Sequence, residues 1–420
     1  MAITDTRPET GTDLAVAPSM VPAPVSILGT GDHTTIGLVY ILASILFGIA
    51  GWIGWSLTEV HGVSTSFLTD SAAQNLGQTT SIGLILLVLV PLFLGIGTYV
   101  TPLQVGAPTV AFPRAAAAAL WTWLLSAGLF IVAATIDGGF GGAREKAVSL
   151  EMLALVGLVV ALLLGTICVL ATIIGLRSPD MSLDRVPMTS FALLVGGSVW
   201  LLTLPVLVGN VLLLWVDHHY GDGTLSAANT QFGQISWILG QPQLYAFVIP
   251  GLGIVADVIA TFTGARLAQR GLLLVGIGAF GILSVGAWAQ PVLYPEAREQ
   301  VVWQAIVLLQ VLPVLLLLAG VATAFKAGRP SPKGALGLAV VSLLLLLLGV
   351  LAGALQAFTP LQLRATGLAA AGQFVLIAAA GLSAAAAGLA YWAPKMTGRM
   401  PADGAAKLGA LVMLGGGALG

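Results

Sequence analysis

Charged residues are scarce in this sequence. Of its 420 residues only 8% are Asp, Glu, Lys or Arg, whereas a soluble domain carries about 25%. So few charges cannot coat a water-facing surface, which excludes a soluble globular protein. Apolar residues make up 58% of the chain and the mean hydropathy is +1.01. The composition therefore predicts an all-helical protein that crosses a lipid membrane many times, with membrane lipid as its surroundings.

Cysteine, histidine and net charge are also low. The single cysteine, Cys168, excludes an intrachain disulfide framework and a cluster of cysteine metal ligands. Sixteen basic residues face seventeen acidic ones, so the chain lacks the basic excess that nucleic acid attracts, and we expect no nucleic-acid partner. The four histidines are His33, His61, His218 and His219. We expect all four in the tail or in outside loops, and none within a span.

Ten apolar stretches are each long enough for a spanning helix, which needs about 20 residues. We place them near residues 35–58, 79–101, 115–136, 150–176, 189–216, 232–260, 270–294, 300–325, 334–357 and 366–393. Residues 1–34 are polar and rich in Pro, Thr and Asp, which predicts a disordered cytoplasmic tail before a single transmembrane domain over 35–420. The 13 residues after Lys407 would form only a partial eleventh helix. Either the chain is truncated inside that helix or its end stops within the bilayer.

The distribution of cations predicts the orientation. If the amino terminus is cytoplasmic, twelve of the sixteen Lys and Arg residues lie in inside loops. The outside loops then hold only Arg144, Lys146, Arg298 and Arg364. Positive residues gather on the cytoplasmic side of membrane proteins. We therefore expect a cytoplasmic amino terminus and a loop around His218 on the outer side.

Five short motifs occur in a fixed order along the chain. They read GAPTVAFPR at 106–114, RSPDMSLDRVPM at 177–188, LPVLVG at 204–209, WILGQPQLY at 237–245 with IPGLG at 249–253, and YWAPKMTG at 391–398. Together they resemble subunit I of the haem-copper oxidases, of the cytochrome c oxidase type found in bacterial plasma membranes. The resemblance runs from about His33 to the end of the chain. It implies an oxidase-like helix bundle, haem and copper as cofactors, and oxidase subunits of the subunit II and III type as partners.

The family holds its metals with six histidines, and none of these positions is histidine here. The resemblance puts the haem ligands at Thr80, Gly372 and Phe374, and the copper ligands at Gln241, Gln290 and Pro291. Imidazole nitrogen is the ligand that haem iron and copper favour. The residues themselves therefore predict neither haem nor copper, although the resemblance alone would imply both.

The proton-handling groups of the family are replaced as well. The acid that follows the copper ligand becomes Gln243, and the Asp of the motif at 106–114 becomes Thr109. Tyr245 does match the position of the family's cross-linked tyrosine, but its partner would be Gln241, which cannot form an imidazole cross-link. A buried tyrosine with a bonded hydroxyl is the commoner role, so no catalytic residue is assigned.

Buried polar residues offer a few further candidates. Glutamine is costly in lipid unless it is hydrogen-bonded, so we expect the following to face the bundle interior as structural contacts: Gln241, Gln243, Gln290, Gln310 and Gln373. Asp257, near the inner end of the sixth stretch, is either functional or paired with Arg266. Cys168 reads as a small core residue.

Three functional hypotheses remain open on the sequence. The chain is a non-catalytic pseudo-enzyme that serves as a structural or assembly partner in a respiratory complex, because the ligand histidines are absent. Alternatively it is a terminal oxidase subunit that oxidises cytochrome c, reduces oxygen and translocates protons, as the resemblance implies. A transporter that reuses the emptied cavity is the third hypothesis, with no motif of its own.

Overall fold

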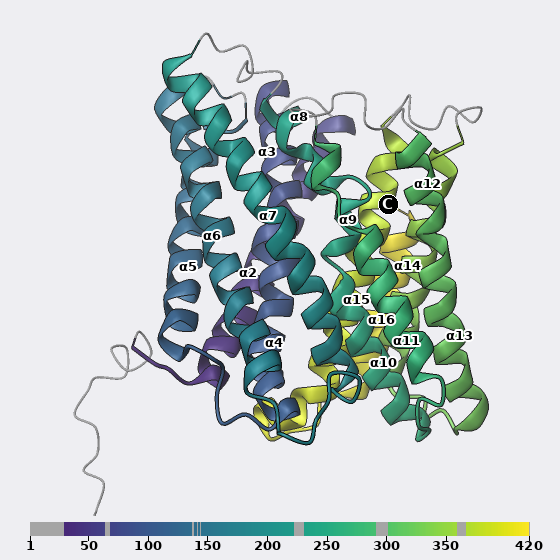
Figure 1. Cartoon of the computed structure of the whole chain (residues 1–420). Helices are drawn as coiled ribbons and strands as arrows, with labels where there is room; N and C mark the ends of the chain where they lie inside the picture. Colours follow the sequence, from purple (N-terminus) through teal and green to yellow (C-terminus); the bar gives the residue numbers. More distant parts are fainter. Residues whose placement is uncertain are drawn as a thin grey trace, which may run out of the picture.

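Long helices running side by side build the whole of the described structure. The computed structural model describes residues 29–63, 68–136, 138–140, 142, 144–221, 231–290, 301–358 and 367–419. The helices are, in chain order, α2 (His33–Val63), α3 (Asp70–Gly83), η1 (Leu84–Leu89), α4 (Val90–Val105), α5 (Pro113–Thr135), α6 (Glu145–Gly175), α7 (Met188–Tyr220), α8 (Gln231–Ile235), η2 (Ser236–Leu239), α9 (Gln243–Ala246), α10 (Ile249–Thr263), α11 (Arg270–Leu283), η3 (Ala287–Ala289), α12 (Val301–Leu309), α13 (Val311–Ala327), α14 (Gly334–Gln356), α15 (Leu368–Thr397) and α16 (Asp403–Leu419). The described residues contain no strand, so the expected all-helical bundle is confirmed (Figure 1).

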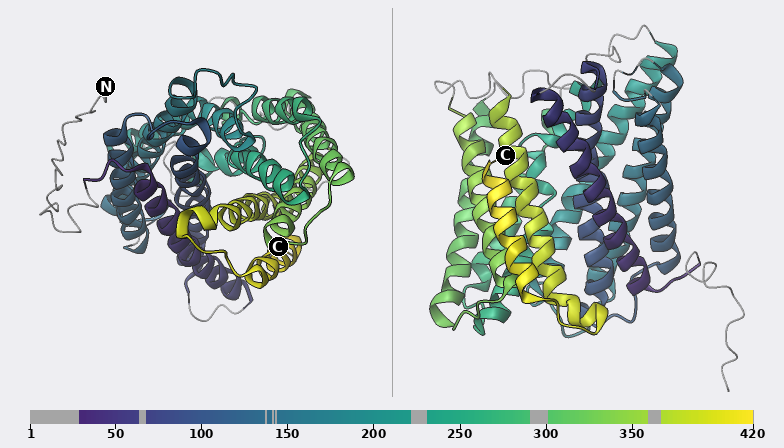
Figure 2. Two further views of the ribbon diagram at one scale, coloured as in Figure 1. Left: turned by 90° about the horizontal axis from the view of Figure 1, so that it is seen from below. Right: turned by 180° about the vertical axis from the view of Figure 1, so that it is seen from behind.

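The helices form one bundle with an order that follows the chain. Seen along its axis, α2 to α5 occupy one side and α11 to α13 the opposite side (Figure 2). The C-terminal helices α15 and α16 lie between these two groups, and both pack against α14. Nine helices in the described ranges are long and apolar enough to cross a membrane. Together they make the chain a multi-pass membrane protein.

The expected sixth span, residues 232–260, is not one continuous helix. It is broken into α8, η2, α9 and α10, of which the longest, α10, has 15 residues. Gly240 has an extended backbone, and Pro242 and Pro250 have no N–H to donate to a preceding turn. The pieces nevertheless run from one end of the bundle to the other, with α8 and α10 at opposite ends (Figure 1). Within the described residues, the ten expected spans are therefore nine continuous candidates and this one interrupted segment.

Close contact between α10 and the start of α7 depends on a glycine. A β-carbon at Gly253 would overlap the Met188 carbonyl and lie 2.7 Å from the Ala192 β-carbon. One turn further along α10, the Asp257 carboxylate accepts hydrogen bonds from Met188 N at 3.3 Å and from Thr189 N and Oγ1 at 3.0 and 2.8 Å. The absent side chain at Gly253 thus lets the carboxylate reach the first free N–H groups of α7.

The position of Asp257 corrects the expected pairing with Arg266. The carboxylate caps the amino terminus of α7, where the helix dipole also favours a negative charge. The guanidinium nearby belongs to Arg270, which donates to the carbonyl oxygens of Asp184, at 2.8 Å, and of Val186. The loop before α7 is therefore held from two sides, and Asp257 has a structural role there.

We predict that Gly253→Ala destabilises the protein by about 1–3 kcal/mol, because the added methyl group overpacks the α7–α10 contact. Alanine is otherwise the better helix former by about 1 kcal/mol, so without the close contact the same substitution would stabilise the helix. Thermal unfolding in detergent measures the change. Gly278→Ala is the matched control, since nothing lies within 4 Å of a β-carbon at that position in α11. Equal melting temperatures for the two variants would contradict the close contact.

Candidate functional site: a closed amide and tyrosine network

The interrupted sixth segment directs a group of polar side chains into the bundle interior. Gln241 follows the extended Gly240, and Tyr245 lies one turn later in α9. Gln241 is 7% exposed, and Gln243 and Tyr245 are fully buried. This confirms that these glutamines face inward. The same segment brings Gln241, at the expected copper-ligand position, close to Tyr245.

A third side chain, Gln373 of α15, completes the group. Its Nε2 donates to Gln241 Oε1 at 2.9 Å and to the Tyr245 hydroxyl at 2.6 Å. The Tyr245 hydroxyl donates in turn to Gln241 Oε1 at 3.1 Å, and Gln356 of α14 donates to Gln373 Oε1 at 2.9 Å. We call Gln241, Tyr245, Gln356 and Gln373 the amide–tyrosine network. It joins α9, α14 and α15 through side chains that are bonded to one another.

The backbone of α14 packs directly against this network. Gln241 Nε2 donates to the Gly353 carbonyl at 3.3 Å. A β-carbon at Gly353 would overlap Gln241 Oε1, the Tyr245 hydroxyl and Gln373 Nε2. Glycine at this position therefore lets α14 approach the three side chains directly, and little room is left between them.

Gln243 and Gln290 occupy two further positions that the resemblance assigns to the oxidase chemistry. Gln243 Nε2 donates to Thr203 Oγ1 at 2.9 Å, and its Oε1 accepts from Gly286 N at 2.9 Å. Gln290 is 3% exposed and meets Asn210, whose amide nitrogen, in its bonding orientation, donates to Gln290 Oε1 at 2.6 Å. Both glutamines tie α7 to the segment after α11. Pro291 lies outside the described residues.

The three expected haem-ligand positions are occupied by residues with other contacts. The Thr80 hydroxyl donates to the carbonyls of Leu76 and Gly77 in its own helix, at 2.8 and 3.0 Å. Phe374 stacks on Trp55 of α2, with ring centroids 6.4 Å apart and an interplanar angle of 19°. Gly372 has no side chain. The residue between these last two positions, Gln373, enters the network instead.

The four histidines lie at helix ends, which corrects the expectation that they sit in the tail and loops. His33 is the first residue of α2 and His61 belongs to its last turn, where Nε2 lies 3.1 Å from Asp70 Oδ1. His218 and His219 belong to the last turn of α7, and His219 stacks on Trp215. The helices continue beyond the apolar stretches, because a polar helix end remains stable at the membrane surface. The described residues hold no group of three or more His, Cys, Asp or Glu that could bind a metal ion.

One buried acid was missed on the sequence. Glu151, in α6, is 1% exposed, and among the described residues its carboxyl group has only a loose contact with the Thr79 side chain. Its place inside the apolar stretch at 150–176 could have marked it as a candidate, because ionisable groups within membrane spans are rare. Cys168, in contrast, is 1% exposed and free, as expected of a core residue.

Haem and copper do not fit the residues at this site. The polar groups that meet there are the side-chain amides of Gln241 and Gln373 and the phenol of Tyr245. They are already hydrogen-bonded to one another. Copper and haem iron require imidazole or similarly strong ligands, which amides do not replace. The close approach of Gly353 leaves these groups no space to accept a metal without breaking their bonds.

Comparison with known proteins agrees with the helix arrangement and the motifs. The family model described as cytochrome c and quinol oxidase polypeptide I matches residues 35–419. The chain belongs to this family. The resemblance noted on the motifs is therefore confirmed, and the all-helical bundle is the fold expected of an oxidase polypeptide I.

Curated relatives are similar over part of their length. "Probable cytochrome c oxidase subunit 1-alpha" of Streptomyces avermitilis is 30% identical over 286 residues, which cover 63% of this chain and 49% of the relative. "Probable cytochrome c oxidase subunit 1-beta" of Nocardia farcinica is 27% identical over 279 residues, which cover 62% of this chain and 47% of the relative. This polypeptide I homologue thus spans about half the length of the curated relatives it matches.

We predict that Gln373→Leu destabilises the protein by about 1–3 kcal/mol, since it removes the donor shared by Gln241 and Tyr245 and leaves buried polar atoms under-bonded. Unfolding in detergent measures the loss, with the exposed Gln269→Leu as the control. Combining Gln373→Leu with Tyr245→Phe should cost less than the sum of the two single changes, because both act on one network. Strict additivity would argue that the two side chains do not interact.

Proposed function

We propose that this chain is a non-catalytic relative of oxidase subunit I, which keeps the fold and has given up the metal sites. Its role is that of a structural or assembly partner for oxidase subunits of the subunit II and III type. It acts in the bacterial plasma membrane with a cytoplasmic amino terminus. Its single transmembrane domain begins with α2 at His33, two residues before the expected boundary, and residues 1–28 of the expected tail lie outside the described residues.

The amide–tyrosine network is the observation that carries this proposal. Gln241 stands at an expected copper-ligand position, and Gln373 lies between two expected haem-ligand positions. Their mutual hydrogen bonds, at 2.6–3.1 Å with Tyr245, turn a region devoted to ligands in the family into a contact between helices. A side chain that stabilises helix packing in this way has no free polar atom for a metal.

The terminal-oxidase hypothesis requires the opposite of this arrangement. It needs imidazoles at the haem and copper positions and an acid near the copper, and the chain has Gln243 at that last position. Gln243 instead bridges Thr203 and the Gly286 backbone. A carboxylate passes a proton by taking it up and releasing it, whereas an amide stays neutral over the physiological pH range. The replacement supports a structural role.

We predict that the purified chain carries no stoichiometric haem or copper. The measurement is a reduced-minus-oxidised optical spectrum together with iron and copper counts for each chain. The Streptomyces avermitilis relative, purified in the same way, serves as the positive control. Haem bands amounting to one or two haems per chain, with copper, would overturn the non-catalytic role and favour the terminal oxidase.

We predict the orientation from the cation distribution. In a Cys168→Ala background, a cysteine introduced at Gly221, after α7, should react with a membrane-impermeant thiol reagent added to intact cells. A cysteine at Arg329, after α13, should react only after the membrane is permeabilised. Gly221 and Arg329 are both exposed, so the difference reports the side of the membrane. The reverse pattern would place the amino terminus outside.

A further inference from the structure

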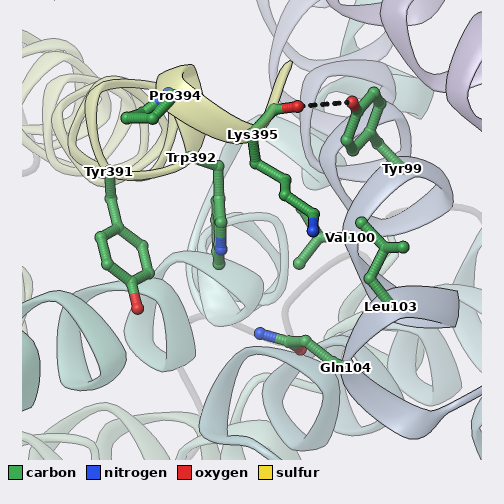
Figure 3. Close-up of a pocket in the computed structure, with 8 residues that line it drawn as sticks. All are labelled: Tyr99, Val100, Leu103, Gln104, Tyr391, Trp392, Pro394 and Lys395. Carbon is green, nitrogen blue, oxygen red and sulfur yellow. Dashed lines mark hydrogen bonds between the residues drawn. The ribbon is translucent and has the colours of Figure 1, made fainter. Parts of the chain in front are cut away.

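A pocket lies at the ends of α4 and α15, away from the amide–tyrosine network. Its volume is about 510 Å³, and the side chains used below are Tyr99, Leu103, Gln104, Tyr391, Trp392 and Lys395. Figure 3 shows these residues around a common space, with α4 on one side and α15 on the other. Both helices end here, at the face that the proposed orientation makes cytoplasmic. The pocket therefore lies where the bilayer meets the inner aqueous phase.

Lys395 supplies a cation that has no carboxylate partner among the described residues. Within the described ranges its ammonium group forms no ion pair, whereas Lys407 is paired with Asp403 at 2.8 Å. In Figure 3 the side chain extends across the pocket toward Val100 and Gln104. Its backbone is held in place, because the Tyr99 hydroxyl donates to the Lys395 carbonyl at 3.3 Å. An unpaired ammonium group in a fixed pocket favours an anionic ligand.

Gln104 adds a hydrogen-bond donor with a fixed orientation. Its Oε1 accepts from Ser190 Oγ at 2.6 Å, so its amide nitrogen points away from Ser190 and toward the pocket (Figure 3). The amide nitrogen and the Lys395 ammonium group thus both offer N–H donors to one space. Helix carboxyl termini by themselves repel anions, so Lys395 is the group on which anion binding depends.

The remaining walls suit the apolar part of an amphipathic molecule. Leu103, which is 47% exposed, lines the pocket from α4, and the rings of Tyr391 and Trp392 line it from α15 (Figure 3). Tyr391 is fixed by a hydrogen bond of 3.1 Å with Thr261. Aromatic rings of this kind gather at the level of lipid headgroups. A soluble anion would make no use of the apolar wall, whereas a lipid would use the wall and the donors together.

We propose that this pocket binds an anionic phospholipid of the inner leaflet, with the phosphate group on Lys395 and Gln104 and the acyl region against Leu103 and Trp392. Charge complementarity supports this occupant, because twelve of the sixteen cations lie on the same proposed side and inner leaflets carry anionic lipids. The site is independent of the metal question and of the proposed assembly role.

The test compares lipid binding by the full chain and its variants. Purified protein in a neutral detergent is titrated with phosphatidylglycerol or phosphatidylcholine, and bound lipid is counted by native mass spectrometry. Lys395→Gln should weaken phosphatidylglycerol binding about fivefold, the effect of one Lys at an anionic surface. Lys395→Arg, which keeps the charge, should retain most of the binding. Lys326→Gln makes the same change at an exposed position in the last turn of α13 and serves as the matched control.

The outcomes separate the lipid site from its alternatives. Selective loss in Lys395→Gln, with Lys326→Gln and phosphatidylcholine binding unchanged, supports the proposal. Equal losses in the two Lys→Gln variants would overturn it, because they would indicate a general attraction to the cationic face. Glycerol phosphate that competes at the same concentration as the lipid would also overturn it, since the apolar wall would then contribute nothing. Unchanged melting temperatures verify that each variant is folded.

Discussion

A polar group buried in a bilayer has to find its hydrogen-bond partner inside the protein, because the lipid offers none. This constraint acts most strongly where the sixth segment is interrupted. The break at Gly240 and Pro242 leaves backbone groups, as well as side chains, without a hydrogen-bond partner in their own helix. The chain meets it with side-chain and backbone groups of other helices. Trp303 donates to the Gln241 carbonyl at 3.3 Å, and Gln241 itself donates to Gly353 of α14. The interrupted segment is thereby attached to α12, α14 and α15.

The same constraint bears on the proposed absence of the metal-ligand histidines in this member of the oxidase polypeptide I family. An imidazole that no longer holds a metal would be a buried polar ring without a partner. Glutamine has both a donor and an acceptor, so two glutamines and a tyrosine can satisfy one another. Gln241, Gln373 and Tyr245 do so in the structure. Glu151 of α6 is the contrasting case, because among the described residues its carboxyl group has only the Thr79 side chain as a polar neighbour.

Glycine and aspartate solve the corresponding problem where α10 meets the start of α7. The free N–H groups at the start of α7 are satisfied by Asp257, and Gly253 provides the close approach that this contact needs. A carboxylate that looks like a functional candidate in the sequence is thus part of the helix packing. Lys395 differs from it, because its side chain lines an open pocket between the ends of α4 and α15. Asp257 thus belongs to the helix packing, whereas Lys395 offers its charge to the proposed lipid.

The sequence by itself determined the membrane class, the places of nearly all the spans and the family, because hydropathy and short motifs are local properties of the chain. It also indicated that Gln241 and Tyr245 face inward, since uncompensated amides are costly in lipid. It also predicted that Gln373, between Gly372 and Phe374, is a structural contact of the bundle interior, but it named no partner for this side chain. Only the tertiary structure decided that Gln373 meets Tyr245, that Asp257 caps α7, and that Lys395 and Gln104 share a pocket. The residues of each pair are 68 to 291 positions apart, and their meeting depends on how whole helices pack, which no local pattern records.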